Sequence, residues 1–253
     1  MEKSRLETYR GFLKDSIRKA IDFRTTDQNM RIPPPPIEKP FDEDAKRIDL
    51  VPPEAWEGIG SIDLRQAIGN RKSRRQYTDQ PLTIEELSFL LWATQGIRRR
   101  MGGLLALRTV PSAGARHALE TYLCALRVEG LEIGFYRYLP VEHQLVLEFA
   151  EPRAADEIVA ASFGQHFLGE AAVNFIWTTI PYRMEWRYDI AAHKVIALDA
   201  GHVCQNLYLA CEAIGAGTCA IAAYDQEAMD RLLQIDGVEE YAIYLAPVGR
   251  VSP

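Results

Sequence analysis

Apolar positions at helical spacing predict six helices in this chain. Thr83-Ile-Glu-Glu86 is a capping box, which satisfies two backbone donors at a helix start, and Gly96 ends that helix. Ser61 is the expected N-cap of a shorter helix, and Gly215 follows the longest one. The predicted helices span residues 4–22, 61–70, 83–96, 154–161, 189–214 and 225–233.

Alternating and continuously apolar segments predict six strands. Between the third predicted helix and the first predicted strand, residues 97–118 show no sustained period, which predicts a loop. The first three strands alternate and are joined by turns, so we expect antiparallel neighbours. Helices on a mostly antiparallel sheet in a single domain make an α+β fold. The predicted strands span residues 119–128, 133–138, 144–149, 173–180, 218–222 and 241–248.

Prolines divide the N-terminal part of the chain from the remainder. They recur from Pro33 to Pro53, where they exclude a helix interior or a central strand and predict an extended arm. We therefore expect an N-terminal helix and arm over residues 1–57, with the helix docked, and the main domain over 58–253. A long segment without regular structure is unusual on a compact monomer, so we expect the arm to wrap around a partner subunit.

Composition changes this picture little. Apolar residues make up 47% of the 253 residues and charged residues 25%, and no apolar run reaches the roughly 20 residues that span a bilayer. The amphipathic N-terminus lacks a secretory h-region, so we expect a cytoplasmic protein without a membrane segment. The four cysteines lie in apolar stretches and predict buried thiols, and the five scattered histidines predict no metal site.

Charge is distributed unevenly. The net charge of -6 argues against a nucleic-acid partner. From Arg71 to Arg116, however, nine Lys or Arg residues stand against three acids. This basic island indicates either one localised anionic ligand or a solvated face that happens to be basic.

Four segments could contact a ligand, and the last of them is Gly249-Arg250, which places a cation at the end of the final strand. Arg71-Lys72-Ser73-Arg74-Arg75 combines guanidinium forks, an ammonium and a hydroxyl, which suits a phosphate monoester. Pro111-Ser112-Ala113-Gly114 has small side chains that let backbone approach a flat ligand, although a simple turn would look similar. The segment 215–225 follows the longest helix. No G-x-G-x-x-G follows a strand, so a dinucleotide site of that kind is not predicted.

In this order, the motifs resemble those of the nitroreductase superfamily over residues 60–250, and most closely its azoline dehydrogenase branch. The resemblance rests on R-x-S-x-R after the first core helix, on residues 108–117 (R-T-V-P-S-A-G-A-R-H) and on D-A-G-H-x-x-Q-N-L before a G-T strand. It implies a homodimer in which two subunits share each FMN, with the long helix at the interface. The small residues of that helix suit a close approach of the partner.

The resemblance also assigns roles to residues of this chain. It implies that the FMN phosphate and ribityl chain are held by Arg71, Lys72, Ser73 and Arg75, with a further charge from Arg250. It places the isoalloxazine ring along Pro111, Ser112, Ala113 and Gly114. Backbone N–H groups of the stretch that contains Ala222 and Ala223 match the segment that reaches flavin N5.

Catalysis in that branch involves a Lys-Tyr pair before the long helix, and Arg187-Tyr188 stands at this position here. Arginine stays protonated and is a poor general base. Tyr188 is therefore the candidate acid-base residue, because an adjacent cation favours a phenolate. The alternative is that Tyr188 only packs at the start of the helix and covers the flavin pocket.

Three functions remain open from the sequence. The first is an FMN-dependent oxidoreductase that transfers a hydride through flavin N5, as in azoline oxidation in modified peptides. The second is a general NAD(P)H-dependent reductase of nitro compounds or quinones. The third is a flavin-binding module without turnover. The substrate would be a small molecule or a peptide delivered by a partner.

Overall fold

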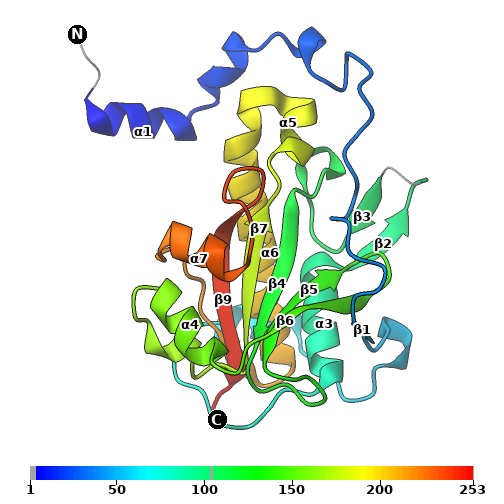
Figure 1. The fold of residues 1–253 in the computed structure, drawn as a ribbon, viewed down its shortest axis with the longest axis vertical. Helices are drawn as coiled ribbons and strands as arrows, with labels where there is room; N and C mark the ends of the chain where they lie inside the picture. Colours follow the sequence, from blue (N-terminus) through cyan, green and yellow to red (C-terminus); the bar gives the residue numbers. More distant parts are fainter. Residues whose placement is uncertain (1–3, 103–104, 253) are drawn as a thin grey trace.

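The computed structural model describes residues 4–102 and 105–252, and its centre is a seven-stranded antiparallel sheet (Figure 1). The strand order is β1-β6-β5-β4-β7-β9-β8. This arrangement confirms the predicted α+β class and the antiparallel neighbours. The strands are β1 (Arg47–Asp49), β4 (Leu119–Ala125), β5 (Gly134–Leu139), β6 (Gln144–Ala150), β7 (Val173–Thr179), β8 (Ala216–Thr218) and β9 (Tyr241–Arg250).

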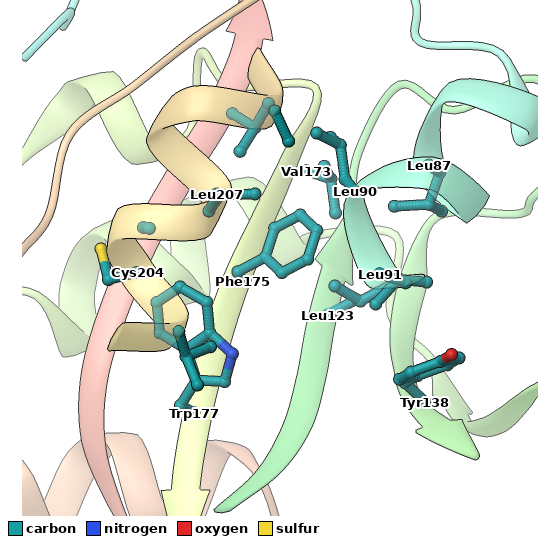
Figure 2. Packing of buried hydrophobic residues seen from close by; sticks show 14 of the residues in the cluster. Leu87, Leu90, Leu91, Leu123, Tyr138, Val173, Phe175, Trp177, Cys204 and Leu207 are labelled. Carbon is teal, nitrogen blue, oxygen red and sulfur yellow. The ribbon is translucent and has the colours of Figure 1, made fainter. Parts of the chain in front are cut away.

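Helices cover both faces of this sheet. One face packs against α3 and α6, where Leu123, Phe175 and Leu207 are fully buried (Figure 2). The other face packs against α4 and α7 through Tyr122 and Cys124. Successive side chains of β4 point to opposite faces, so one strand supplies both cores. The helices are α1 (Arg5–Leu13), α2 (Leu64–Asn70), α3 (Ile84–Gln95), α4 (Ala154–Ala161), α5 (Tyr182–Tyr188), α6 (Ala192–Ala213) and α7 (Gln226–Leu232).

Helix starts were predicted with mixed success. The capping box is confirmed, because the Glu86 amide donates to Thr83 Oγ1 at 3.1 Å and the Thr83 amide donates to Glu86 Oε2 at 2.9 Å. The N-cap of α2 is Asp63 rather than Ser61. The long helix α6 begins at Ala192 instead of residue 189. Asp189, at φ 51°, separates α6 from α5. Helix α5 was not predicted.

The segment 97–118 was wrongly predicted to be a loop throughout. It contains a two-stranded ribbon, β2 (Ile97–Arg100) paired antiparallel with β3 (Ala106–Arg108). Arginines occupy most of β2 and are exposed, so no alternation of apolar residues marks this strand.

The N-terminal helix was predicted as one docked element over 4–22. Instead α1 ends at Leu13, and a separate turn of 3-10 helix covers Asp15–Ala20. None of the residues of α1 is buried, and it stands away from the body of the molecule (Figure 1). Its apolar residues are therefore exposed within this chain, including Leu6, Tyr9 and Leu13.

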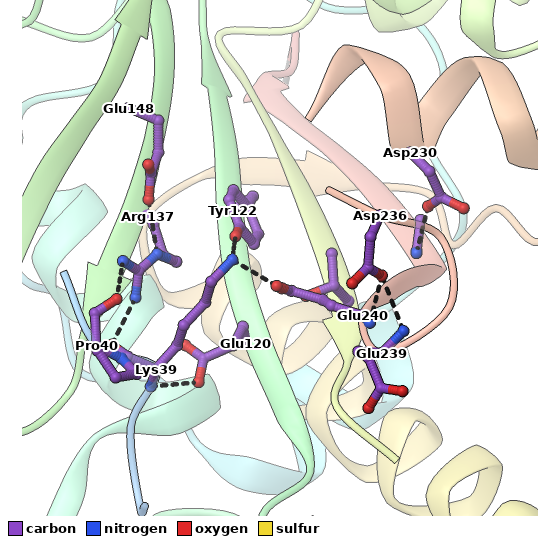
Figure 3. Close-up of polar contacts among 12 residues, drawn as sticks. Lys39, Pro40, Glu120, Tyr122, Arg137, Glu148, Asp230, Asp236, Glu239 and Glu240 are labelled. Atoms are coloured by element: carbon purple, nitrogen blue, oxygen red, sulfur yellow. Dashed lines mark hydrogen bonds and ion pairs between the residues drawn. The ribbon is translucent and has the colours of Figure 1, made fainter. Parts of the chain in front are cut away.

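The proline arm lies against its own chain for part of its length. The Lys39 amide donates to Glu120 Oε1 at 3.0 Å, and Lys39 Nζ lies 2.5 Å from Glu240 Oε2 (Figure 3). Arg137 donates to the carbonyls of Lys39 and Pro40 at 3.0 and 3.1 Å. The arm also contributes β1 to the sheet, so it is not wholly irregular. Wrapping around a partner stays a prediction.

No helix within residues 4–102 and 105–252 is long and apolar enough to cross a membrane. That part of the chain also contains no group of three or more His, Cys, Asp or Glu residues placed to hold a metal ion. All four cysteines are buried and free, which confirms them as buried thiols: Cys124, Cys204, Cys211 and Cys219.

Candidate functional site

The basic segment 71–75 lies beside β8 directly after α2. The Arg74 amide donates to the carbonyl of Thr218 at 2.9 Å, and Ser73 pairs with Thr218 as an isolated parallel bridge. Gly217 permits this approach, because a Cβ there would lie 2.6 Å from Arg74 Cδ. Two of the segments that the sequence marked as ligand-capable, 71–75 and 215–225, are therefore adjacent in space.

Tyr208 of α6 links these two segments. Its hydroxyl lies 2.9 Å from Ser73 Oγ and accepts a hydrogen bond from the Ala220 amide at 2.8 Å. The Arg71 guanidinium lies 5.2 Å from the centre of the Tyr208 ring. Sequence reasoning missed this residue, since a tyrosine within an apolar helix stripe gives no local sign of a polar role.

A pocket of about 440 Å³ opens at the basic segment. Among the described residues, none of the cations Arg71, Lys72, Arg74 and Arg75 has a carboxylate within 4 Å. Thr218 Oγ1 and Arg74 Nε are buried beside it without a hydrogen-bond partner. Uncompensated cations next to a pocket with unused polar atoms fit an anionic ligand such as a phosphate monoester. The pocket is lined by Lys72, Ser73, Arg74, Arg75, Gln76, Tyr77, Val251 and Ser252.

Arg250 lies outside that lining. Its guanidinium forms an ion pair with Glu86 and donates to the carbonyl of Ile214. The charge of Arg250 is therefore compensated within the chain. A contact with phosphate would require Arg250 to exchange one of these partners, so that role stays a prediction.

The loop 111–114 lies between α6 and the end of α5. On one side, the Ala113 amide donates to Asp199 Oδ2 at 3.4 Å. Burial raises the pKa of Asp199, while hydrogen bonds from Ser112 and Ala113 act in the opposite direction. On the other side, a Cβ on Gly114 would lie 2.7 Å from the Tyr188 hydroxyl. Gly114 also has φ 59°, which favours glycine, so no other residue fits here without strain.

The segment 221–223 continues from β8. Ile221 exchanges both backbone hydrogen bonds with Leu245 of β9. Ala222 and Ala223 follow and are exposed, and within the described residues neither amide donates a hydrogen bond. Free amides at this place are what the predicted role near a flavin ring requires.

The sequence and the fold of this chain are similar to those of known proteins. The model of the nitroreductase family matches residues 68–250. A Methanocaldococcus jannaschii protein named a nitroreductase is 33% identical over 192 residues, which cover 76% of this chain and 93% of that protein. The chain belongs to the nitroreductase family. It is thus a nitroreductase-family oxidoreductase.

Further proteins similar to this nitroreductase-family chain include a processing protein and two solved structures. The trifolitoxin-processing protein TfxB of Rhizobium leguminosarum is 27% identical over 206 residues, covering 77% of this chain and 53% of that protein. A nitroreductase-like structure from Ralstonia eutropha has a TM-score of 0.68 at 26% identity over 87% of this chain and 99% of its own. The Escherichia coli microcin synthetase McbBCD complex has a TM-score of 0.61 at 19% identity over 100% of this chain and 99% of the matched chain.

In this nitroreductase-family chain the predicted site residues form two groups rather than one. The basic segment contacts α6 at Tyr208, and the loop 111–114 contacts α6 at Asp199. Asp199 and Tyr208 are nine residues apart, which corresponds to about 13 Å along a helix axis at 1.5 Å per residue. Nine residues also correspond to about two and a half turns, so Asp199 and Tyr208 project from opposite sides of α6.

Proposed function

We propose that this oxidoreductase depends on FMN. The observation that carries this proposal is the pocket at residues 72–77, with cations that lack carboxylate partners and a hydroxyl, Ser73, held beside Tyr208. Arg71, Lys72, Ser73 and Arg75 would hold the phosphate and ribityl chain, with Arg250 at the margin. When bound, FMN supplies hydride transfer at N5. Pro111 to Gly114 would lie along the ring, and the amides of Ala222 and Ala223 would face it.

The test of this proposal is direct. The purified protein should be yellow, and heat denaturation should release FMN and not FAD, because a single phosphate pocket suits the mononucleotide. Chromatography of the released flavin against both standards identifies it. A colourless protein that takes up no FMN in a fluorescence titration would remove the proposal.

Arg75 lines this pocket and Arg71 lies over the ring of Tyr208, so these two arginines provide the test variants. Arg71→Ala or Arg75→Ala should weaken FMN binding at least tenfold, because a charge-assisted hydrogen bond is worth about 1.5 to 3 kcal/mol. Arg99→Ala is the matched control, since Arg99 is exposed on β2 and far from α2 in the chain. Dissociation constants from flavin fluorescence quenching measure the effect. Equal losses in all three variants would reveal only diffuse electrostatics.

We further propose a homodimer built on α6. Two observations support it: the two groups of predicted flavin residues lie apart on α6, and apolar side chains such as Leu198 on α6 and Leu64 on α2 are exposed. A second subunit would cover these side chains and bring the loop of one chain to the basic segment of the other. Isologous pairing of this kind is the commonest symmetry of soluble oligomers.

Two truncations test the contribution of the N-terminal part to this dimer. Removing residues 1–55 should lower stability and flavin occupancy together, since it deletes β1 and Leu50, which is 6% exposed, from the core. Removing only residues 1–22 deletes α1 and leaves these core contacts intact. Light scattering and absorbance at the flavin band report mass and occupancy. A monomeric full-length protein with full FMN content would contradict the dimer.

For the reaction, we propose azoline oxidation in modified peptides as the first candidate. It is supported by the likeness to the trifolitoxin-processing protein and by the motif order that resembles the azoline dehydrogenase branch. The second candidate is NAD(P)H-dependent reduction of nitro compounds or quinones. Arg187 favours this alternative, because an arginine next to Tyr188 cannot remove the proton that azoline oxidation releases.

Anaerobic flavin reduction separates these candidates. Reduction by an azoline-containing peptide supports the dehydrogenase, and reduction by NADH or NADPH supports the reductase. Reduction by neither class of donor would favour a flavin-binding module without turnover.

A further inference from the structure

Arg116 and Arg187 both lie near the loop 111–114, which contacts Tyr188. The Arg187 Cδ and Nε atoms both lie 3.0 Å from the position of a Cβ on Gly114, and its guanidinium lies 5.6 Å from the centre of the Tyr188 ring. Arg116 follows Gly114 by two residues, and its guanidinium lies 4.7 Å from the centre of the Trp186 ring. The two cations therefore share one end of the loop, and each lies over an aromatic residue of α5.

Neither cation is neutralised within the described residues, where no carboxylate oxygen lies within 4 Å of Arg116 or Arg187. The acids nearest to Arg187 in sequence have other partners. Glu185 lies 2.7 Å from the Nε2 of His193, and Asp189 accepts the amide of Ile190 at 2.6 Å. Arg116 donates its Nε to a neutral acceptor, the carbonyl of Arg183, at 3.1 Å.

Burial makes this arrangement costly without an anion. Arg116 is only 7% exposed. Burial, followed by the charges of Arg187 and Arg183, lowers the pKa of Arg116. Like charges near one another in a partly desolvated region repel, and an oxyanion bound by both arginines would offset that repulsion. Guanidinium groups are also the preferred partners of carboxylates, because their donors match both oxygens.

We propose that Arg116 and Arg187 recognise a carboxylate of the substrate beside Tyr188. This inference rests on the proposed function, since it places the substrate at the loop that would lie along the flavin. The proposed site gives Arg187 a binding role: Arg187 binds an anionic substrate and does not act as a general base. The carboxylate could belong to a small organic acid or to an acidic residue of a peptide, and both present the same group to the arginines.

Calorimetric titration of the flavin-loaded protein with benzoate and with benzamide tests this site. The two probes share shape and differ in charge, so we expect benzoate to bind at least tenfold more tightly. Arg187→Gln and Arg116→Gln should each weaken benzoate binding roughly tenfold and leave benzamide unchanged. Arg99→Gln provides the control, because it removes an exposed arginine of β2. Arg187→Lys should show a weaker but remaining preference for benzoate. Lysine keeps the positive charge and lacks the paired donors of the guanidinium.

A second pair of probes identifies the source of the carboxylate. Acetyl-Gly-Glu-Gly-amide and its Gln counterpart should differ in affinity, in an Arg187-dependent manner, if the natural carboxylate is carried by a peptide. Discrimination of benzoate alone would assign a small acid. Equal affinities for benzoate and benzamide, or a preference that survives in both Gln variants, would overturn the inference.

The outcome is separable from that of the proposed function. A protein that releases FMN but does not distinguish benzoate from benzamide refutes only the carboxylate site. A protein without FMN refutes the proposed function, whatever the probes do. Arg187 is half-buried at the end of α5, so its variant provides the test even if the more buried Arg116 variant fails to fold.

Discussion

Replacing Tyr188 with Phe should lower turnover by about 10² to 10⁴ and leave FMN affinity unchanged. This is the usual size of a lost acid-base group. The Tyr188 hydroxyl lies against Gly114 in the loop that would follow the flavin ring. The Arg187 guanidinium lies 5.6 Å from the centre of the Tyr188 ring. The substitution removes one oxygen and keeps the aromatic body, so packing of the half-buried ring is preserved.

Tyr182→Phe is the matched control on the same helix. Its hydroxyl donates to Asp27 Oδ2 at 2.7 Å, and Tyr182 lies about 9 Å from Tyr188 along the helix axis at 1.5 Å per residue. Single-turnover flavin reduction and reoxidation would measure the chemical steps, and flavin absorbance would measure occupancy. A Tyr188→Phe protein that binds FMN normally and turns over at the wild-type rate would leave only the packing role for this tyrosine.

Replacing Glu120 with Ala should cost about 3 to 5 kcal/mol of the free energy of unfolding, the usual penalty for breaking a buried ion pair. Glu120 and Arg183 are 3% and 2% exposed, and their charged atoms lie 2.5 Å apart. The same carboxylate accepts the amide of Lys39, so the substitution also loosens the arm (Figure 3). Arg183, whose Nη1 already lacks a partner, would lose its only carboxylate within reach in the described chain.

Urea unfolding measures this loss, with Glu132→Ala as control. Glu132 pairs with Lys46 on the surface, where an ion pair is worth about 0 to 1 kcal/mol. Burial opposes ionisation of Glu120, but Arg183, Arg108 and Arg137 together lower its pKa. A lowered folded-state pKa means that the stabilisation is present at neutral pH and is lost as the pH falls through that value. The difference between wild type and variant should therefore shrink in acid, and a constant difference would contradict the assignment.

Local chemistry was sufficient to predict most elements of the fold. The capping box of α3 and the antiparallel pairing of β4 to β6 were predicted from neighbouring residues, and the structure retains both. The predictions failed where such signals are weak. Helix α5 spans only Tyr182–Tyr188, and its separation from α6 depends on one left-handed residue, Asp189. Strand β2 pairs through its backbone while its arginines are exposed, so its sequence has no apolar period.

For the candidate site, the sequence alone determined the kinds of chemistry present: a cluster of cations at 71–75, small residues at 111–114 and a tyrosine before the long helix. Residue types and their order along the chain carry that information. Only the tertiary structure decided which of these meet. Tyr208 joins Ser73 to Ala220, and Arg187 lies against Gly114. Those contacts join residues 12 to 135 positions apart, and they exist because sheet and helix packing, not local spacing, brings such segments together.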